Sequence, residues 1–216
     1  MARPQIRVTE IFLSLQGETS TTGIPTVFVR LTGCPLRCGY CDTSYAFQGG
    51  AMMSLEEIIA QVADYGVSHI TVTGGEPLAQ PDVLILLKQL CDANYRVSLE
   101  TSGALSVIDV DKRVAKILDL KTPGSGESER NHYQNIEYLT SKDEIKFVIC
   151  DRRDYEWTKD QIQRLGLNNK ELGLLLSPVA GQLEARTLAE WIIADRLDVR
   201  LQVQLHKLLW GDEQAR

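Results

Sequence analysis

The stretch Cys34-Pro35-Leu36-Arg37-Cys38-Gly39-Tyr40-Cys41 places three thiols in one eight-residue loop, directly after the apolar run 27–31. The C-x3-C-x2-C spacing lets one compact loop wrap a corner of a cubane iron–sulfur cluster, which four thiolates normally hold. Because this loop supplies only three thiolates, one iron would keep a free position for a small molecule. The loop therefore predicts an iron–sulfur cluster with one open iron, ligated by Cys34, Cys38 and Cys41.

Two other interpretations of these cysteines fit the sequence less well. A structural zinc site needs a second close pair of Cys or His ligands, whereas Cys91 and Cys150 stand alone and the three histidines are scattered. Stable disulfides need an oxidising compartment, and the first residues contain no apolar signal segment. An odd number of cysteines without a signal predicts a chain that stays in the reducing cytoplasm.

The composition sets wider limits on the function. The 216 residues are 44% hydrophobic and 24% charged, which is enough for one sizeable core, and no linker interrupts them, so we expect a single domain over residues 1–216. The longest aliphatic stretch, 83–87, is too short to cross a bilayer. The net charge of -6 argues against direct nucleic-acid binding, which relies on clustered Lys and Arg. Chemistry on a small molecule is the favoured class of function.

Strand and helix patterns alternate along the chain. Their order predicts an α/β fold with parallel strands and right-handed crossovers. The polar and glycine-rich segments follow the carboxyl ends of the expected strands, which share one rim in a β/α barrel. We expect strands at 6–16, 25–32, 69–73, 96–99, 115–120, 145–150, 172–176 and 199–205, and helices at 55–66, 81–93, 131–139, 154–165 and 183–197.

Arg30 is the first candidate binding residue outside the cysteine loop. In the strand 25–32, Phe28, Arg30 and Thr32 alternate with aliphatic residues, so Arg30 points away from the aliphatic face. A guanidinium in that place needs an anion. The spacing leaves two interpretations equally open, a clamp on the carboxylate of a ligand and a structural ion pair.

Two motifs together carry a resemblance to a known family. The three cysteines, with aromatic Tyr40 before the last, resemble the motif of radical S-adenosylmethionine (SAM) enzymes, and Gly74-Gly75-Glu76-Pro77 resembles the motif of that superfamily that meets the methionine end of SAM. Within the superfamily, the stretches 14–18, 29–34, 41–43, 100–103, 119–126, 141–144 and 204–207 resemble the family of 7-carboxy-7-deazaguanine synthases. The resemblance covers most of the chain, residues 8–210.

This resemblance implies a reaction and its cofactors. The expected fold is an incomplete β/α barrel of the radical SAM type. The expected reaction contracts 6-carboxy-5,6,7,8-tetrahydropterin to 7-carboxy-7-deazaguanine with loss of ammonia, on the route to 7-deazapurines such as queuosine. The implied cofactors are a [4Fe-4S] cluster, SAM and Mg2+, and SAM bound at the open iron would yield the radical that abstracts hydrogen from C6 of the substrate.

The resemblance also implies roles for individual residues. Arg30 would pair with the substrate carboxylate, and Thr43 would give an oxygen ligand to Mg2+. The alternative for Thr43 is a purely structural role as a turn residue after Asp42. The remaining expected substrate-binding residues are Leu15, Gln16, Gly17 and Thr101. The expected SAM-binding residues are Tyr40, Glu76, Gly103, Ser141, Lys142, Asp143, Ser177 and Gln204.

Partners and rival functions complete the expectations. The family pattern implies a homodimer and an electron donor such as a flavodoxin. The nearest rival function is that of an activase, which generates a glycyl radical on a partner protein. Such an activase would share the cysteines and Gly74-Gly75-Glu76-Pro77 but would not need Arg30. A rival from another class is a non-enzymatic iron–sulfur carrier or zinc-stabilised binding module.

Overall fold

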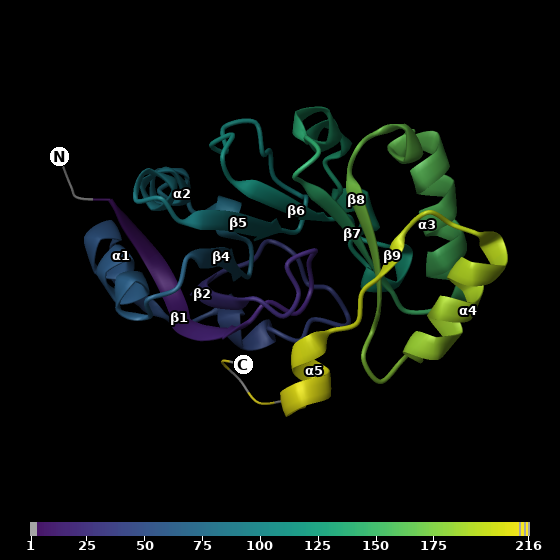
Figure 1. Cartoon of the computed structure of the whole chain (residues 1–216), viewed down its shortest axis with the longest axis horizontal. Coiled ribbons are helices and arrows are strands. Elements are labelled where there is room, and N and C mark those ends of the chain that lie inside the picture. The colour runs from purple at the N-terminus through teal and green to yellow at the C-terminus, as the bar shows by residue number, and fades with distance from the viewer. Residues whose placement is uncertain (1–3, 212, 214, 216) are drawn as a thin grey trace.

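The computed structural model describes residues 4–211, 213 and 215, and its nine strands form one sheet in the order β3-β1-β2-β4-β5-β6-β7-β8-β9 (Figure 1). The strands are β1 (Gln5–Leu15), β2 (Pro25–Leu31), β3 (Ala51–Ser54), β4 (His69–Gly74), β5 (Arg96–Thr101), β6 (Ala115–Asp119), β7 (Glu144–Ile149), β8 (Gly173–Pro178) and β9 (Arg200–Leu201). The end strands β3 and β9 do not pair with each other. The sheet is therefore an open, incomplete β/α barrel, as predicted.

The parallel strands run from β2 through β4 to β9. The expectation of parallel strands is wrong for β1, which pairs antiparallel with both β2 and β3. The loop 16–24 that joins β1 to β2 is too short for the helical crossover that parallel neighbours need. The expected strand 199–205 shrinks to β9, and its last residue starts a short helix, α5 (Leu205–Trp210).

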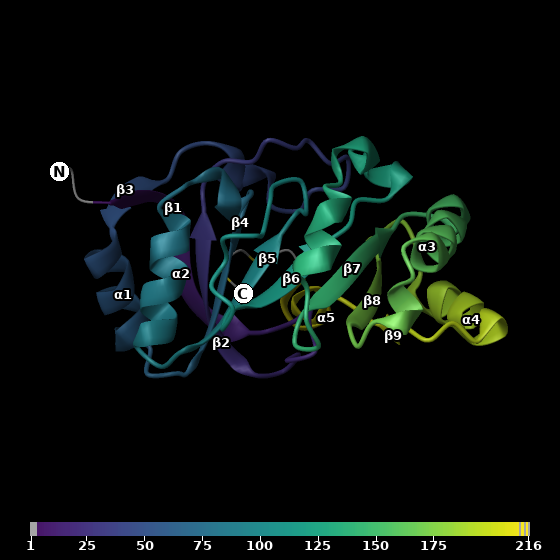
Figure 2. The ribbon, with the colours of Figure 1, turned by 90° about the horizontal axis from the view of Figure 1, so that it is seen from above.

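Four longer helices lie along the outer side of the curved sheet (Figures 1 and 2). They are α1 (Leu55–Asp64), α2 (Val83–Asp92), α3 (Arg152–Arg164) and α4 (Ala185–Asp195). The connections on either side of β6 contain no α-helix among the described residues, and the helix expected at 131–139 is a 3-10 helix, Tyr133–Tyr138. No described helix has the length and apolar character that a membrane span requires.

The core lies between the sheet and these outer helices. Val27, Val29 and Leu31 of β2 are fully buried there, together with side chains of α1 and α2. Strand alternation sends Phe28 and Arg30 to the opposite, inner side of the sheet, where both line a pocket. The prediction that Arg30 points away from the aliphatic face is confirmed.

Candidate active site

The inner side of the sheet holds a pocket of about 580 Å³. Its wall includes residues at the carboxyl ends of β2, β4, β5, β6 and β7, the cysteine loop, and the segment around α5. Figure 1 shows α5 near the loop that follows β1, and the amide N–H of Leu205 donates to the carbonyl oxygen of Gly17 (3.2 Å). The loop after β1 and the segment around α5, which are far apart in the sequence, therefore meet at the same cavity.

Cys34, Cys38 and Cys41 all line this pocket, and all three are free thiols. Burial raises the pKa of each thiol above its usual value, and nearby Lys121 acts in the opposite direction on all three. Thiols in such a setting become stable thiolates when they bind metal. Three thiols from one loop facing one cavity fit the iron–sulfur cluster that the sequence predicts.

Cys150 is the cysteine that could have completed a fourth thiolate position. It does not line the pocket, since its Sγ packs near Gly124 and pairs with Asp154. Cys91 is buried in the core beside the helices. Within the described residues, only the three cysteines of the loop bring sulfur to the cavity, so one iron of a bound cluster would have no thiolate from this chain.

The turn after β4 packs directly against the cysteine loop. The amide N–H of Glu76 donates to the carbonyl oxygen of Gly33 (2.8 Å), and a Cβ built on Gly75 would lie only 2.1 Å from that oxygen. Gly74 has φ +143°, a conformation that residues with a side chain rarely adopt. Gly74 and Gly75 both line the pocket, so bare backbone faces whatever binds beside the cysteines.

Glu76 takes a different position from the two glycines. Its side chain is fully buried and does not line the pocket. The carboxylate accepts hydrogen bonds from Thr101 Oγ1 (2.9 Å), the amide of Ser102 (2.7 Å) and the amide of Leu78 (3.0 Å). Glu76 therefore ties the turn after β4 to the end of β5, and its side chain has no direct path to a ligand.

A chain of alternating charges crosses the floor of the pocket. Lys146 Nζ lies 2.8 Å from Glu18 Oε2 and 3.7 Å from Asp119 Oδ2, and Lys121 Nζ lies 3.0 Å from the same Asp119 oxygen. Burial by itself would raise the pKa of Glu18, but Lys146 outweighs it and lowers this pKa to about 2. Asp119 Oδ1 is buried without a hydrogen-bond partner, which leaves one acceptor in the wall for a bound molecule.

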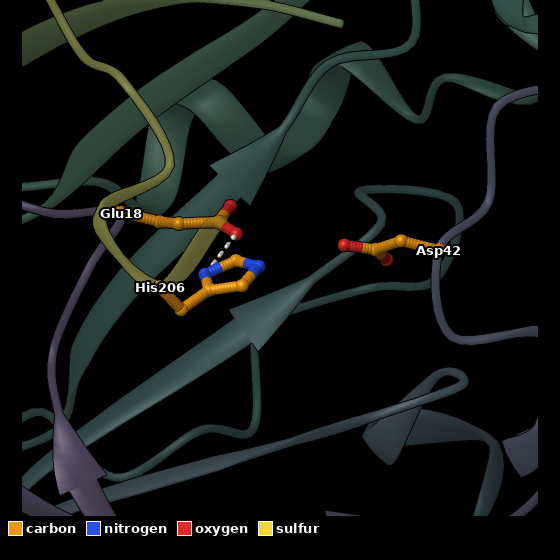
Figure 3. A group of neighbouring side chains, drawn as sticks. All are labelled: Glu18, Asp42 and His206. Carbon is orange, nitrogen blue, oxygen red and sulfur yellow. Dashed lines mark ion pairs between the residues drawn. The ribbon is translucent and has the colours of Figure 1, made fainter. Parts of the chain in front are cut away.

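Glu18, Asp42 and His206, which all line the pocket, form a further group of neighbouring side chains (Figure 3). Their ligand atoms lie within 4.8 Å of one another, and His206 Nδ1 is 3.7 Å from Glu18 Oε1. This trio could hold a cation. However, the negative charge of ionised Glu18 is already balanced by Lys146. The group is therefore better suited to accept hydrogen bonds from a polar ligand than to attract a second positive charge.

All five expected substrate-binding residues line the pocket: Leu15, Gln16, Gly17, Arg30 and Thr101. Gln16 is almost completely buried, and its Oε1 accepts from the amides of Gly17 (2.8 Å) and Glu18 (2.9 Å). It therefore shapes the loop that presents Glu18. Arg30 is ion-paired through Nε with Glu10 (2.7 Å) and also lines the cavity, so both interpretations of Arg30 have a structural basis.

The expected cofactor-binding residues divide into two groups. Tyr40, Thr43 and Gln204 line the pocket, and Thr43 Oγ1 donates to Asp42 Oδ1 (2.8 Å). Gly103 and Ser177 do not line it. Gly103 directly follows the last residues of β5 with φ +74°, while Ser177 is buried on β8 beside Val148 of β7.

Ser141, Lys142 and Asp143 lie at the wrong end of the sheet for a contact with the cysteine loop. They directly precede β7, whereas the pocket lies at the carboxyl ends of the parallel strands, and they line a separate depression of about 360 Å³. Asp143 is fully buried and pairs with Lys116 Nζ (2.9 Å). The structure therefore corrects their expected placement.

Several pocket residues were not predicted to be functional: Glu18, Asp42, Asp119, Lys121, Lys146 and His206. All of them except Lys146 lie inside stretches that carried the family resemblance, so a signal was present for them. Lys146 is a mid-strand residue of β7. Only its strand parity, which places it on the inner side of the sheet, could have indicated it.

Comparison with known proteins adds a family model and close relatives. The model of the radical SAM superfamily matches residues 28–174. A 7-carboxy-7-deazaguanine synthase of Koribacter versatilis is 42% identical over 222 aligned residues, which cover 96% of this chain and 98% of the relative. Another, of Chlorobaculum tepidum, is 44% identical over 211 residues and covers 96% of both chains.

Solved structures give the same result at the level of the fold. The crystal structure of QueE from Escherichia coli superposes with a TM-score of 0.77 at 28% identity, covering 93% of this chain and 94% of that chain. Streptococcus suis SuiB, solved with bound SAM, superposes with a TM-score of 0.57 at 17% identity over 80% of this chain and 44% of that one. The latter likeness shows a shared fold alone.

Proposed function

The chain belongs to the radical SAM superfamily and, within it, to the family of 7-carboxy-7-deazaguanine synthases, and from this we propose that it converts 6-carboxy-5,6,7,8-tetrahydropterin to 7-carboxy-7-deazaguanine and ammonia. Ring contraction with loss of one ammonia balances the atoms of the reaction, so no external oxidant is consumed. The proposal places this chain in 7-deazapurine biosynthesis, the route to queuosine. The observation that carries it is the meeting of three cysteines, the bare Gly74–Gly75 backbone and Arg30 around one cavity.

The cofactors of the superfamily fit the residues present. When bound, the [4Fe-4S] cluster and SAM supply the radical that starts the reaction. Cys34, Cys38 and Cys41 hold the cluster, and the Gly75 backbone beside them offers polar groups to SAM. Tyr40 and Gln204 line the same wall, and the unpaired oxygen of Asp119 gives a further acceptor.

The substrate occupies the other half of the cavity in this proposal. Arg30 pairs with its carboxylate, because guanidinium matches a carboxylate with two parallel hydrogen bonds. Ionised Glu18 and neighbouring Gln204, 3.1 Å apart, accept from and donate to the polar pterin ring. Leu15, Gln16, Gly17 and Thr101 complete the wall. Thr43 is proposed as an oxygen ligand of Mg2+, which prefers such ligands, and the Asp42 carboxylate adds negative charge beside it.

The remaining features of the proposal concern the assembly and its surroundings. We propose a single domain over residues 1–216, a cytoplasmic homodimer, and a one-electron donor such as a flavodoxin. The continuous sheet supports one domain, and free thiols suit a reducing compartment.

Anaerobic turnover tests the function directly. Reconstituted protein is incubated with SAM, Mg2+, a reductant and the carboxypterin, and mass spectrometry follows the loss of ammonia. We expect product from the unmodified protein and from Cys91→Ala, whose thiol is in the core, and none from Cys38→Ala. A protein that cleaves SAM only with a partner polypeptide would instead be a glycyl-radical activase. A colourless, zinc-loaded protein would be a carrier or binding module.

A further inference from the structure

Glu10 lies directly behind the proposed carboxylate-binding arginine. In the antiparallel pair of β1 and β2, Glu10 and Arg30 are opposite each other in register. Glu10 Oε1 accepts from Arg30 Nε at 2.7 Å, and the two side chains are only 20% and 16% exposed. Arg30 lines the pocket, whereas Glu10 does not. Glu10 can therefore influence a bound molecule only through its neighbours.

The contact uses one edge of the guanidinium and leaves the other edge for a ligand. Glu10 takes Nε, and no hydrogen bond from the two terminal nitrogens of Arg30 is present within the described residues. Those nitrogens can offer parallel N–H groups to a carboxylate. The face of the guanidinium is fixed as well, since Cζ lies 5.6 Å from the ring centre of Phe12, which stacks on Phe28 at 5.2 Å.

The same oxygen of Glu10 accepts a second hydrogen bond. Tyr45 donates its hydroxyl to Glu10 Oε1 at 2.8 Å, and Tyr45 also lines the pocket. Tyr45 belongs to the short 3-10 helix Ser44–Phe47, which directly follows Thr43. One carboxylate oxygen thus joins the arginine on β2 to the segment that continues the cysteine loop.

We propose that Glu10 is a positioning residue for substrate binding: it fixes Arg30 by the Nε edge so that the terminal nitrogens meet the substrate carboxylate, and it holds Tyr45 in the wall beside them. This inference rests on the proposed function and deepens it. It assigns the geometry of the carboxylate clamp to a residue that does not touch the substrate. It also explains why an arginine needed by a ligand carries a permanent partner.

A positioning role and a purely electrostatic role of Glu10 predict opposite effects of its removal on substrate binding. The negative charge of Glu10 reduces the attraction of Arg30 for a second carboxylate, so an effect of charge alone would make its removal strengthen binding. An effect of position would make removal of the acceptor weaken binding. Glu10→Gln separates the two, because the amide oxygen keeps an acceptor at the same length while the charge is lost.

The experiment compares Glu10→Gln with Glu10→Ala in steady-state turnover of the carboxypterin. We expect Glu10→Ala to raise KM about tenfold or more, in line with a displaced bidentate contact, and Glu10→Gln to stay within about threefold of the unmodified enzyme. The affinity for SAM and the inhibition constant of a tetrahydropterin without the 6-carboxylate should change in neither variant. If Glu10→Ala does not fold, Glu10→Met, which keeps the bulk without the acceptor, replaces it.

Arg30→Ala provides the second half of the test. In that background Glu10→Ala should raise KM no further, because the residue acts through Arg30. Three results would each overturn the positioning role. KM could be the same in the unmodified enzyme and both Glu10 variants, or Glu10→Gln and Glu10→Ala could change KM equally. The third is that Glu10→Ala changes KM as much in the Arg30→Ala background as in the unmodified enzyme. Absence of product from the unmodified enzyme would instead refute the proposed function, so the two failures are distinguishable.

Discussion

At the scale of single residues, the charges on the floor of the pocket are set by burial and pairing together. Lys146 and Glu18 lie 2.8 Å apart with side chains only 9% and 19% exposed. Burial alone would destabilise both ions, but the attraction between the two opposite charges outweighs this cost. The pKa of Lys146 is therefore raised and that of Glu18 is lowered. The pair keeps its charges throughout the physiological range and gives the pocket a fixed polarity.

This pair predicts a pH dependence of stability. The pKa of Glu18 falls from 4.5 to about 2 on folding, so its contribution is complete above about pH 4.5 and is lost as the pH falls toward 2. We expect Glu18→Gln to lower the free energy of unfolding by on the order of 2 kcal/mol at pH 7 and by roughly half of that at pH 3, since the folded-state carboxylate is protonated only as the pH falls through about 2. Urea unfolding of the apo-protein at both pH values measures this.

The control for the pH experiment is Glu129→Gln, which changes an exposed carboxylate and should give the same small difference at both pH values. A difference between Glu18→Gln and the unmodified protein that stayed constant from pH 7 to pH 3 would show that Glu18 gains nothing from Lys146. The unfolding transition must remain two-state for the comparison to hold.

How far single residues could be predicted depended on how local their chemistry is. The three cysteines were predictable because their spacing alone defines a ligand set. Ser141, Lys142 and Asp143 were misplaced because a similar tripeptide does not say at which end of a strand it lies. Glu10 was missed because its role depends on the register of β1 against β2, which the sequence pattern alone does not determine.

At the scale of elements, helix α3 supports the cysteine loop through an intermediate loop. Asp154 in the first turn of α3 is 1% exposed, and its carboxylate accepts from the amide of Gly124 (2.8 Å), Thr122 Oγ1 (3.1 Å) and the amide of Cys150 (3.0 Å). The carbonyl oxygen of Ser125 then accepts from the amide of Gly39 (3.0 Å). One buried carboxylate therefore holds the loop 122–126 against the cysteine loop.

Loss of this carboxylate should affect both stability and cluster binding. Asp154→Ala leaves the amides of Gly124 and Cys150 without their acceptor, whereas Thr122 Oγ1 keeps the carbonyl oxygen of Val148 (2.8 Å). We therefore expect a loss of roughly 2–4 kcal/mol in the free energy of unfolding and lower iron content after reconstitution. Asp160→Ala, on the exposed part of the same helix, is the matched control and should leave both nearly unchanged. Normal iron content and stability in Asp154→Ala would show that α3 does not support the cysteine loop.

The sequence predicted elements well where a periodic apolar face was present. The helix expected at 55–66 is present as α1, and it begins with a capping box in which the Glu57 amide donates to Ser54 Oγ at 3.2 Å. The helix expected at 131–139 is wrong because only Asn135 and Ile136 of the 3-10 helix are buried there, too few for a helical stripe against the sheet. The strand β3 was missed because its four residues gain their hydrogen bonds from β1.

At the scale of the whole molecule, the function depends on distant parts of the chain meeting at one cavity. Gln202 Nε2 donates to the carbonyl oxygen of Gly17 (3.0 Å), and Gln204 Nε2 donates to Glu18 Oε1 (3.1 Å). These contacts join the segment after β9 to the loop after β1, although the two edges of the sheet do not pair. The sequence could predict which strand ends carry polar groups, but the curvature that brings the first loop to the last segment depends on the packing of all nine strands.

Such a closed arrangement predicts that the chain unfolds as one cooperative unit. One apolar core runs from Ile6 to Ile192 along the continuous sheet, so damage in the N-terminal half should destabilise the C-terminal half equally. Leu86 on α2 is fully buried, and Leu86→Ala should cost about 2–5 kcal/mol. We expect the same lowered midpoint in urea from far-ultraviolet circular dichroism and from the fluorescence of Trp157 and Trp191, which lie on α3 and α4 far along the chain. The control is Ile85→Ala, at a neighbouring position that is 42% exposed, which should shift the midpoint far less. A shared core transmits the loss of packing to every strand that it joins. If Leu86→Ala left the tryptophan transition unchanged, the chain would therefore consist of two domains rather than one.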